Sequence, residues 1–308
     1  MVTMSRRRWL MGAAALAGCE PLRSISIQNV DALMRGAAPT PVRLAEPRVP
    51  GAQLAALWVG HATVLLQLGE RYVITDPVFT NAVGQFSSRL VDPGLSLEAV
   101  PALDACVISH MHFDHLSLGT LSSLETRIDR LFLPVHGRRY LPSFDFPMEE
   151  VPKWVRRHHR GLRLTSVPVR HEGHRYGFDD AWMGESYGGW VVQSEEHTVY
   201  FGGDTAWQEE HFAHVAATFP SIDLALLPIG PVFPRAFMDS HHIDGRQAID
   251  ALRILNADAM IPIHYETFAH GADRPGEALR YFREALDAAP DLEDRVVVLP
   301  IGGQVVLA

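Results

Sequence analysis

Six consecutive residues of this chain contain four side chains that can bind a metal ion. They are His110, His112, Asp114 and His115, and the apolar residues 105–108 come directly before them. While the chain is extended, His110 and His112 point to one side, and a turn then brings Asp114 and His115 toward a second point nearby. A lone histidine in a polar loop usually bonds to water or backbone. Four ligands at this spacing instead predict a site for two metal ions.

Three more metal-type residues follow expected buried strands farther along the chain. They are His171, Asp204 and His264, and open α/β sheets place their sites at such strand ends. Gly202 and Gly203 would let the backbone before Asp204 approach an ion closely. Taken singly, each is compatible with a hydrogen-bonded loop residue, and Asp204 with a helix cap. Taken together, they predict three ligands for each ion and one bridging carboxylate, with room for a shared hydroxide.

Composition and charge exclude several classes of protein. The chain has 308 residues, of which 47% are hydrophobic and 20% charged, so it can bury a large core and is neither collagenous nor disordered. A net charge of -9 argues against a nucleic-acid partner. An anionic substrate stays compatible with this charge, because bound cations dominate the local field of a metal site. The 16 histidines raise the expectation of metal binding.

The first 19 residues have the pattern of an export signal. Arg6, Arg7 and Arg8 form a basic start, and residues 11–17 are an apolar run too short to span a bilayer. The segment resembles a bacterial lipoprotein signal, in which Cys19 becomes the lipidated first residue, and its arginines resemble a twin-arginine signal. We therefore expect a lipid-anchored protein of the cell envelope, on the periplasmic or outer face of a membrane. The alternative is an uncleaved amphipathic start.

The remaining sequence predicts a tether at 20–53 and one α/β domain at 54–308, with two β-sheets face to face and helices outside. Strands are expected at 54–59, 63–68, 72–75, 105–108, 131–133, 164–169, 190–193, 198–201, 224–228, 259–263 and 296–300. Helices are expected at 118–124, 208–217, 245–256 and 276–288. Cys106 has no expected disulfide partner and is interpreted as a small core residue.

The order of the metal-type residues resembles that of the metallo-β-lactamase superfamily. Further strings across 54–302 resemble, more narrowly, N-acylphosphatidylethanolamine-hydrolysing phospholipase D and its bacterial relatives. The strings are Trp-Val-Gly-His-Ala-Thr (58–63), Thr-Asp-Pro-Val-Phe (75–79), Gly-Asp-Thr (203–205), Leu-Pro-Ile-Gly (227–230), Pro-Arg-Ala-Phe-Met (234–238), His-Ile-Asp (242–244) and Ile-His-Tyr-Glu-Thr-Phe (263–268). The resemblance implies a four-layer αβ/βα sandwich and a zinc-dependent phosphodiesterase that acts on such lipids.

The resemblance also implies a role for each residue of the site. It implies one zinc ion on His110, His112 and His171, a second on Asp114, His115 and His264, with Asp204 as the bridge. Asp76 would lie beneath the metal loop and orient it. His242 would lie close to the centre, in contact with the substrate phosphate.

The expected mechanism follows from the charge of two ions. They would lower the pKa of a shared water, so that hydroxide attacks at phosphorus, and would offset the charge on the phosphoryl oxygens. Asp114 or Asp204 would orient the hydroxide, and His242 is the candidate for phosphate contact or for protonating the leaving group. All ligands are nitrogen or oxygen, which admits zinc, manganese or iron. His112, where oxygen-reducing di-iron relatives carry glutamate, favours zinc.

Departures from the family's pattern leave the substrate open. Where the lipid-hydrolysing relatives carry an aromatic-rich stretch, this chain has residues 151–160, which include the basic run Arg-Arg-His-His-Arg. A small soluble phosphorylated or lactone substrate is one alternative, and a catalytically idle, lipid-anchored binding protein is another. His136 and His174 are interpreted as surface or supporting residues. Two interpretations are compatible with a set of aromatic and apolar residues: they line an entrance for acyl chains, or they pack in the core. These residues are Phe79, Phe86, Leu90, Tyr140, Leu141, Phe144 and Phe146.

Overall fold

The computed structural model describes residues 20–84, 87–176, 179, 185–269 and 271–308. The expected export signal, with Cys19, lies outside these residues, as does Phe86. Among the helices of the described part, none is long and apolar enough to cross a lipid bilayer.

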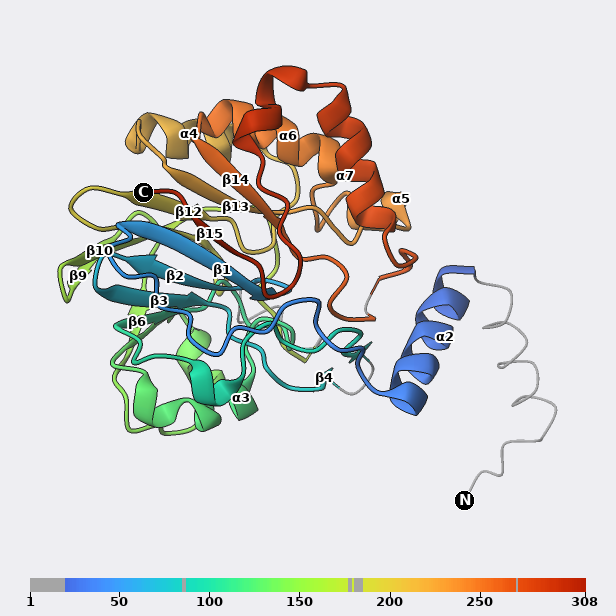
Figure 1. Ribbon diagram of the computed structural model, residues 1–308, viewed down its shortest axis with the longest axis horizontal. Coiled ribbons are helices and arrows are strands. Elements are labelled where there is room, and N and C mark those ends of the chain that lie inside the picture. The colour runs from blue at the N-terminus through green and yellow to red at the C-terminus, as the bar shows by residue number, and fades with distance from the viewer. Residues whose placement is uncertain (1–19, 85–86, 177–178, 180–184, 270) are drawn as a thin grey trace.

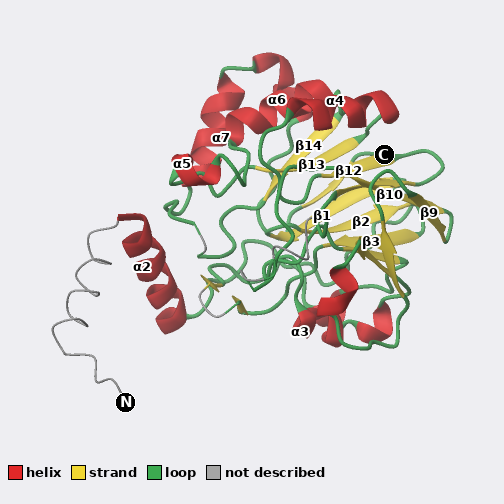
Figure 2. Cartoon of the chain, turned by 180° about the vertical axis from the view of Figure 1, so that it is seen from behind, coloured by secondary structure: helices red, strands yellow, loops and turns green. Residues whose placement is uncertain are grey.

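Two β-sheets pack face to face and helices cover their outer faces, as the sequence predicted (Figure 1). The first sheet has seven strands, in the order β15-β1-β2-β3-β6-β7-β8. In chain order these strands are β1 (Leu54–Gly60), β2 (Thr63–Leu68), β3 (Arg71–Thr75), β6 (Ala105–Val107), β7 (Leu131–Pro134), β8 (Met148–Val151) and β15 (Gln304–Val306). Helix α3 (Leu118–Ser123) lies against the outer face of this sheet (Figure 2).

The second sheet has six strands, in the order β14-β13-β12-β11-β10-β9. In chain order these are β9 (Arg156–His159), β10 (Leu162–Val167), β11 (Gly189–Gln193), β12 (Thr198–Phe201), β13 (Leu224–Pro228) and β14 (Ala259–Ile263). Its outer face is covered by α4 (Glu209–Thr218), α6 (Gly245–Leu255) and α7 (Glu277–Asp287) (Figure 2). Helix α2 (Glu20–Arg35) lies outside these layers. The smaller elements are α5 (Arg235–Met238), β4 (Ala82–Val83), β5 (Ser87–Ser88) and the 3-10 turns Leu97–Ala99, Glu125–Arg127, Gly137–Tyr140 and Pro290–Arg295.

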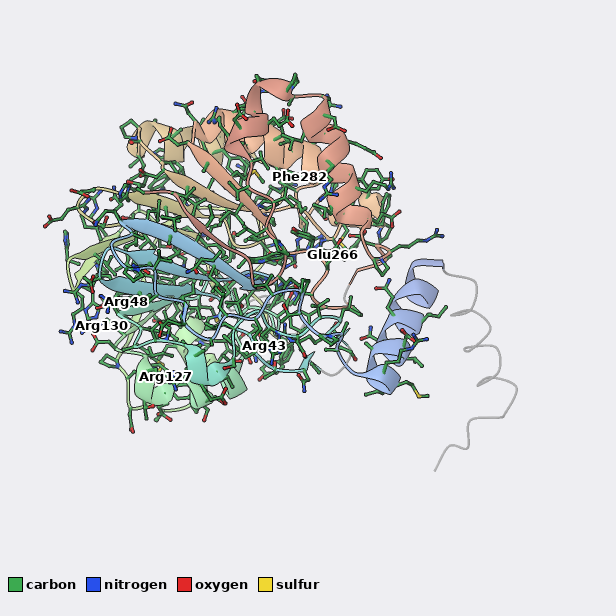
Figure 3. All side chains as sticks on the ribbon, viewed as in Figure 1. Arg43, Arg48, Arg127, Arg130, Glu266 and Phe282 are labelled. Atoms are coloured by element: carbon green, nitrogen blue, oxygen red, sulfur yellow. The ribbon has the colours of Figure 1, made fainter. Side chains whose placement is uncertain are left out.

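Apolar side chains fill the space between the sheets and the space under the helices. Every residue of β1 and β2 is buried. Because both faces of these strands are covered, their sequences are nearly continuous apolar runs. Trp58 and Trp190 belong to the core that the two sheets share. Phe282 of α7 (Figure 3) packs so closely on Gly245 of α6 that a Cβ there would lie 2.5 Å from its Cα. The two sheets and the outer helices thus form a rigid frame for the loops at the strand ends.

Most expected elements agree with the structure to within two residues, but the end of the chain was predicted wrongly. The expected strand at 296–300 is irregular, with only an isolated bridge from Val296 to Met260. Instead, β15 completes the first sheet beside β1. The edge strands β8 and β9 were missed, because their charged and polar residues hide the apolar alternation.

The segment at 20–53, expected to be a tether, makes polar contacts with the domain in the structure. Two side chains of α2 hold it there: Gln28 Nε2 donates to Asp273 O at 2.8 Å and Asn29 Nδ2 to Ala269 O at 2.7 Å. After the helix, Arg43 and Arg48 (Figure 3) pair with Asp92 at 3.3 Å and Glu70 at 2.7 Å. These contacts are polar and long-range, so apolar periodicity gave no sign of them.

Candidate metal centre

The metal loop, residues 109–117, joins β6 to α3 and is held from both sheets. Gly188 N donates to Ser109 O at 2.9 Å, which ties the start of the loop to the segment before β11. Arg175 Nη1 donates to Met111 O at 2.8 Å and to Leu116 O at 2.9 Å. The connection between β10 and β11 in the second sheet therefore fixes the loop, and a buried guanidinium binds two of its backbone carbonyls.

The first ligand group is formed by His110, His112, His171 and Asp204, whose donor atoms all lie within 4.8 Å of one another. His112 Nδ1 lies 2.8 Å from His110 Nε2 and 3.4 Å from His171 Nε2. Three imidazoles from the metal loop and the end of β10 thus converge on one point. The structure places these residues together as the sequence predicted.

The second group contains Asp114, His115 and His264 together with His61, again with all donor atoms within 4.8 Å. His115 Nε2 faces His264 Nε2 at 3.1 Å. Asp114 Oδ2 lies 3.6 Å from His115 Nε2 and 3.7 Å from His264 Nε2. His61 was not among the predicted ligands, although its motif was recognised. His61 lies in the turn between β1 and β2. Nothing in the sequence around this turn indicated that it would meet residues 114 and 264.

Asp204 lies between the two groups. Its Oδ2 is 3.8 Å from the Nε2 atoms of both His110 and His171, and 3.2 Å from His115 Nε2. Its Oδ1 is 3.0 Å from His264 Nε2. One carboxylate therefore faces both sets of imidazoles, which is the arrangement expected of a bridging ligand.

The outward nitrogen of each main histidine has its own partner, which orients the ring. His115 Nδ1 donates to Asp76 Oδ2 at 2.6 Å, His171 Nδ1 to His241 O at 3.0 Å, and His264 Nδ1 to Gly230 O at 2.8 Å. His110 Nδ1 contacts Ser109 Oγ at 2.9 Å. Such bonds fix the tautomer and leave the Nε2 lone pair for an ion. His112 differs, because it presents Nδ1 to the centre.

Burial and charge divide the histidines into two kinds. Burial holds the pKa of His110 and His171 well below the usual value and lowers that of His112 to about 4. Burial also lowers the pKa of His264, but the Asp204 charge and hydrogen bonds with Asp114 and Asp204 outweigh it and raise the pKa to about 9. The first group thus offers neutral imidazoles at neutral pH, whereas His264 holds a proton when no metal competes.

The carboxylates of the centre are strongly acidic. Burial alone would raise the pKa of Asp114 and Asp204, but the facing His115, with further histidines, lowers both well below the usual value. The same carboxylates raise the pKa of His115 against the effect of burial. The centre thus keeps its two anionic ligands ionised at neutral pH, ready for a cation.

The donor set fits a pair of divalent ions. Two pairs of imidazole nitrogens face each other at 2.8 and 3.1 Å, and lone pairs at such distances repel unless a proton or a cation lies between them. The described ligand clusters contain only imidazole and carboxylate groups. Cys106 is buried in β6, apart from the clusters, as expected of a core residue. This set suits zinc, manganese or iron.

Two residues with positive φ, Gly203 and Asp76, lie where the chain contacts the metal loop. Gly203 has φ +56, and a Cβ on it would lie 2.5 Å from Ser109 Cβ. Glycine is therefore needed here for contact with the metal loop, whereas the sequence suggested close approach to the ion itself. Asp76, with φ 34, lies beneath the loop as expected and accepts hydrogen bonds from Ser109 N and His115.

His242 lies at the edge of the centre, close to the place that the family resemblance implied. Its Nδ1 is 3.7 Å from Asp204 Oδ2, and its side chain is 12% exposed. Arg235 Nη1 donates to His242 O at 3.0 Å. Asp244 caps helix α6 through a capping box with Gln247. The strings 234–238 and 242–244 therefore hold His242 beside the bridging carboxylate.

Other sequence candidates are placed away from the centre or beside it. His136 is exposed, whereas the His174 ring centroid lies 4.9 Å from that of His112. The basic run belongs to β9 and the turn after it, where Arg157 pairs with Glu149 at 2.5 Å and Arg160 with Asp129 at 3.0 Å. Of the described aromatic and apolar candidates, Phe79 and Phe146 are buried in the core of the first sheet, and Tyr140, Leu141 and Phe144 are partly buried against it.

Known proteins are similar to this chain in sequence and in fold. A family model described as a β-lactamase superfamily domain matches residues 71–265. The chain is 30% identical over 276 residues to N-acyl-phosphatidylethanolamine-hydrolyzing phospholipase D 1 of Caenorhabditis elegans, a match that covers 82% of this chain and 75% of that protein. It is 26% identical over 224 residues to a metal-dependent hydrolase of Pyrobaculum arsenaticum, covering 68% and 84% of the two chains.

The solved structures agree with the sequence relatives. A metallo hydrolase from Ignicoccus hospitalis superposes with a TM-score of 0.61 at 20% identity, covering 82% of this chain and 97% of that structure. This likeness shows the fold, while the family match spans more than half of the chain. The two largely buried groups of histidine and aspartate side chains add candidate metal sites, which the fold alone does not supply. The chain therefore belongs to the metallo-β-lactamase superfamily of metal-dependent hydrolases.

Proposed function

We propose that this protein is a dinuclear zinc phosphodiesterase of the phospholipase D type, acting on lipids that resemble N-acylphosphatidylethanolamine. The observation that carries the proposal is the Asp204 carboxylate shared by two buried ligand groups. The 30% identity to the C. elegans phospholipase, over 82% of this chain and 75% of that protein, supports the substrate class.

Two bound ions would supply a nucleophile from water at neutral pH and offset the charge that develops on the phosphoryl oxygens. His110, His112 and His171 would hold one ion, and Asp114, His115 and His264 the other, with Asp204 between them. Asp114 and Asp204 stay ionised, so either can accept a hydrogen bond from the attacking water and orient it. His242 lies near Asp204 and is partly exposed, where it would contact a phosphoryl oxygen or protonate the leaving group.

The side chains around the centre are compatible with an amphiphilic substrate. Tyr176 and Phe237 are large apolar side chains that are each 59% exposed. Tyr176 contacts the ring of Phe113 in the metal loop, with centroids 5.8 Å apart, and Phe237 stacks on His241, with centroids 4.7 Å apart. Exposed aromatic rings beside the ligands offer apolar surface to acyl chains. A small soluble phosphorylated or lactone substrate is the alternative.

We also propose that the protein is anchored to a bacterial membrane, on its periplasmic or outer face, through lipidated Cys19. Helix α2 would begin directly after the anchor. Its outward face presents Ile27, Val30, Leu33 and Met34, which are 57%, 60%, 80% and 82% exposed. Exposed apolar residues at helical spacing are typical of helices that lie in a membrane surface. Figure 1 places α2 at the margin of the molecule, where it can approach such a surface.

A product assay tests the proposed substrate class. The zinc-loaded protein is incubated with detergent-dispersed N-acylphosphatidylethanolamine, with a soluble phosphodiester and with a lactone, and the products are identified by mass spectrometry. The proposal predicts phosphatidic acid and N-acylethanolamine from the lipid, and no turnover by Asp204→Ala. Turnover of only the soluble substrates would favour the alternative, and no turnover of any would favour a binding protein.

A further inference from the structure

His61 occupies the turn between β1 and β2 and is fully enclosed by the protein. Its side chain is 1% exposed, and its backbone is left-handed, with φ 56. Three backbone bonds fix it: its N–H donates to Thr267 Oγ1 at 2.7 Å, and its carbonyl accepts from Trp58 Nε1 at 2.9 Å and from His264 N at 3.0 Å. The turn of the first sheet is therefore bonded to the end of β14 in the second sheet.

The imidazole of His61 reaches two ligands of the second group. Its Nε2 lies 3.0 Å from Asp114 Oδ2, a distance at which an N–H donates to a carboxylate. Its ring centroid lies 3.9 Å from that of His264, and the edge of Phe268 closes the other side at 5.2 Å. The ring is thus held between a ligand of the metal loop and a ligand of the second sheet.

We propose that His61 is a positioning residue for the second metal ion, an inference that rests on the dinuclear centre proposed above. It holds Asp114 through its side chain and His264 through its backbone carbonyl and ring. Carboxylate ligands that are themselves hydrogen-bonded keep one oxygen directed at the ion. Asp114 is the ligand that most needs this support, because it is 17% exposed, whereas His115 and His264 are fully buried.

The left-handed backbone supports a specific role for this residue. A non-glycine residue with positive φ is uncommon and strained, and it persists only where the surrounding structure requires it. Gly60 before it also has positive φ, at 132°, and the β1–β2 register shifts at this point. The turn therefore bends in a way that directs the His61 ring toward the centre and away from the solvent.

Two variants separate the effect of the side-chain hydrogen bond from that of the backbone. Both His61→Leu and His61→Gln place a side chain of similar size at the strained position, but only glutamine carries an N–H where imidazole Nε2–H lies. Dissociation constants for both ions are measured by chelator competition in the Zn²⁺ and Co²⁺ forms. Asp114→Ala and His171→Ala identify which constant belongs to which ligand group.

The proposal predicts that His61→Leu lowers the affinity for one ion by about 10–100-fold, and that this is the ion whose binding Asp114→Ala also weakens. The affinity for the ion bound by His171 should stay unchanged. His61→Gln keeps most of the affinity. Unchanged binding in His61→Leu would overturn the proposal. Equal loss in His61→Gln and His61→Leu would also overturn it, since His61 would then be a ligand itself or only a packing residue.

A third variant covers the case in which His61→Leu fails to fold. His61→Asn tolerates the left-handed backbone, but its side chain is too short to reach Asp114, so it should lose the same ion selectively. Retention of both ions by His61→Asn would contradict the proposal. The outcome is distinct from that of the substrate assay, because a protein that binds two ions without cleaving the lipid would refute the proposed substrate and leave this test intact.

Discussion

His115 Nδ1 donates to Asp76 Oδ2 at 2.6 Å, and neither side chain has any exposed surface. Asp76 also accepts from Ser109 N at 2.6 Å, so it bonds both the start of the metal loop and its last ligand. Burial raises the pKa of Asp76, while the His115 charge and hydrogen bond lower it in part. The buried carboxylate therefore orients His115.

Asp76→Asn keeps the shape of this residue and removes its charge. We expect metal affinity to fall by about 10–100-fold, the usual effect of losing a partner behind a metal-bound histidine. Dissociation constants measured by chelator competition check this result, with circular dichroism to confirm an intact fold. An affinity equal to that of the wild type would show that Asp76 acts only in packing.

Removal of a proposed metal ligand should lower the rate of hydrolysis far more than removal of an exposed histidine does. Asp204→Ala and His112→Ala should each abolish hydrolysis, because each breaks the ligand set that holds the ions. His158→Ala is the matched control, since His158 is exposed on β9, and it should keep wild-type activity. Initial rates on the best substrate give the comparison. Wild-type rates in either ligand variant at full metal occupancy would contradict the dinuclear mechanism.

The two metal ions should respond differently to pH. The pKa of His264 is raised to about 9 and that of His115 is also raised, so both hold protons at neutral pH in the metal-free protein. Binding at the second group must displace these protons, and its affinity rises with pH by about tenfold per unit for each proton released. The first group has neutral histidines, with the pKa of His112 at about 4. Its affinity should be nearly flat across the neutral range.

Calorimetry of metal binding measures this difference directly. Titrations in buffers of different ionisation enthalpy give the number of protons released with each ion. Proton release should accompany the ion bound by His115 and His264, and should be lost for that ion in His264→Ala. Equal proton release for both ions would contradict the assignment of the two kinds of histidine.

Membrane association tests the proposed anchor. The wild-type protein should fractionate with membranes, because a lipoprotein cysteine carries the two or more acyl chains that stable anchoring needs. Cys19→Ser should release the protein or leave its precursor unprocessed, with unchanged activity on a detergent-dispersed substrate. Leu33→Glu with Met34→Glu should weaken binding of an unlipidated form to vesicles. A wild-type protein found wholly in the cytoplasm would remove this argument for a lipid substrate.

The sequence was sufficient to predict the two sheets and to single out the seven candidate ligands, whose side chains the structure brings together. Strand ends gather functional residues on one side of a sheet, so the placement of Asp204 and His264 followed from the apolar runs before them. The metal loop, His110 to His115, was recognisable from its spacing alone. These inferences depend on local patterns, which a single sequence displays directly.

Long-range contacts could not be predicted in the same way. His61 meets His264 because the β1–β2 turn bonds to the end of β14 about 200 residues later, and it meets Asp114 across 53 residues of chain. Arg175 fixes the metal loop from a segment that showed no pattern. The edge strands β8 and β9 and the packing of α2 likewise depend on partners far along the chain.

The metal content of the purified protein tests the central claim most directly. The protein is loaded under zinc-replete conditions, freed of loosely bound ions, and analysed by mass spectrometry for metal per chain. Two ligand groups that share Asp204 predict about two zinc ions per chain, and about one in His264→Ala. A wild-type protein that keeps one ion or none would contradict the dinuclear centre.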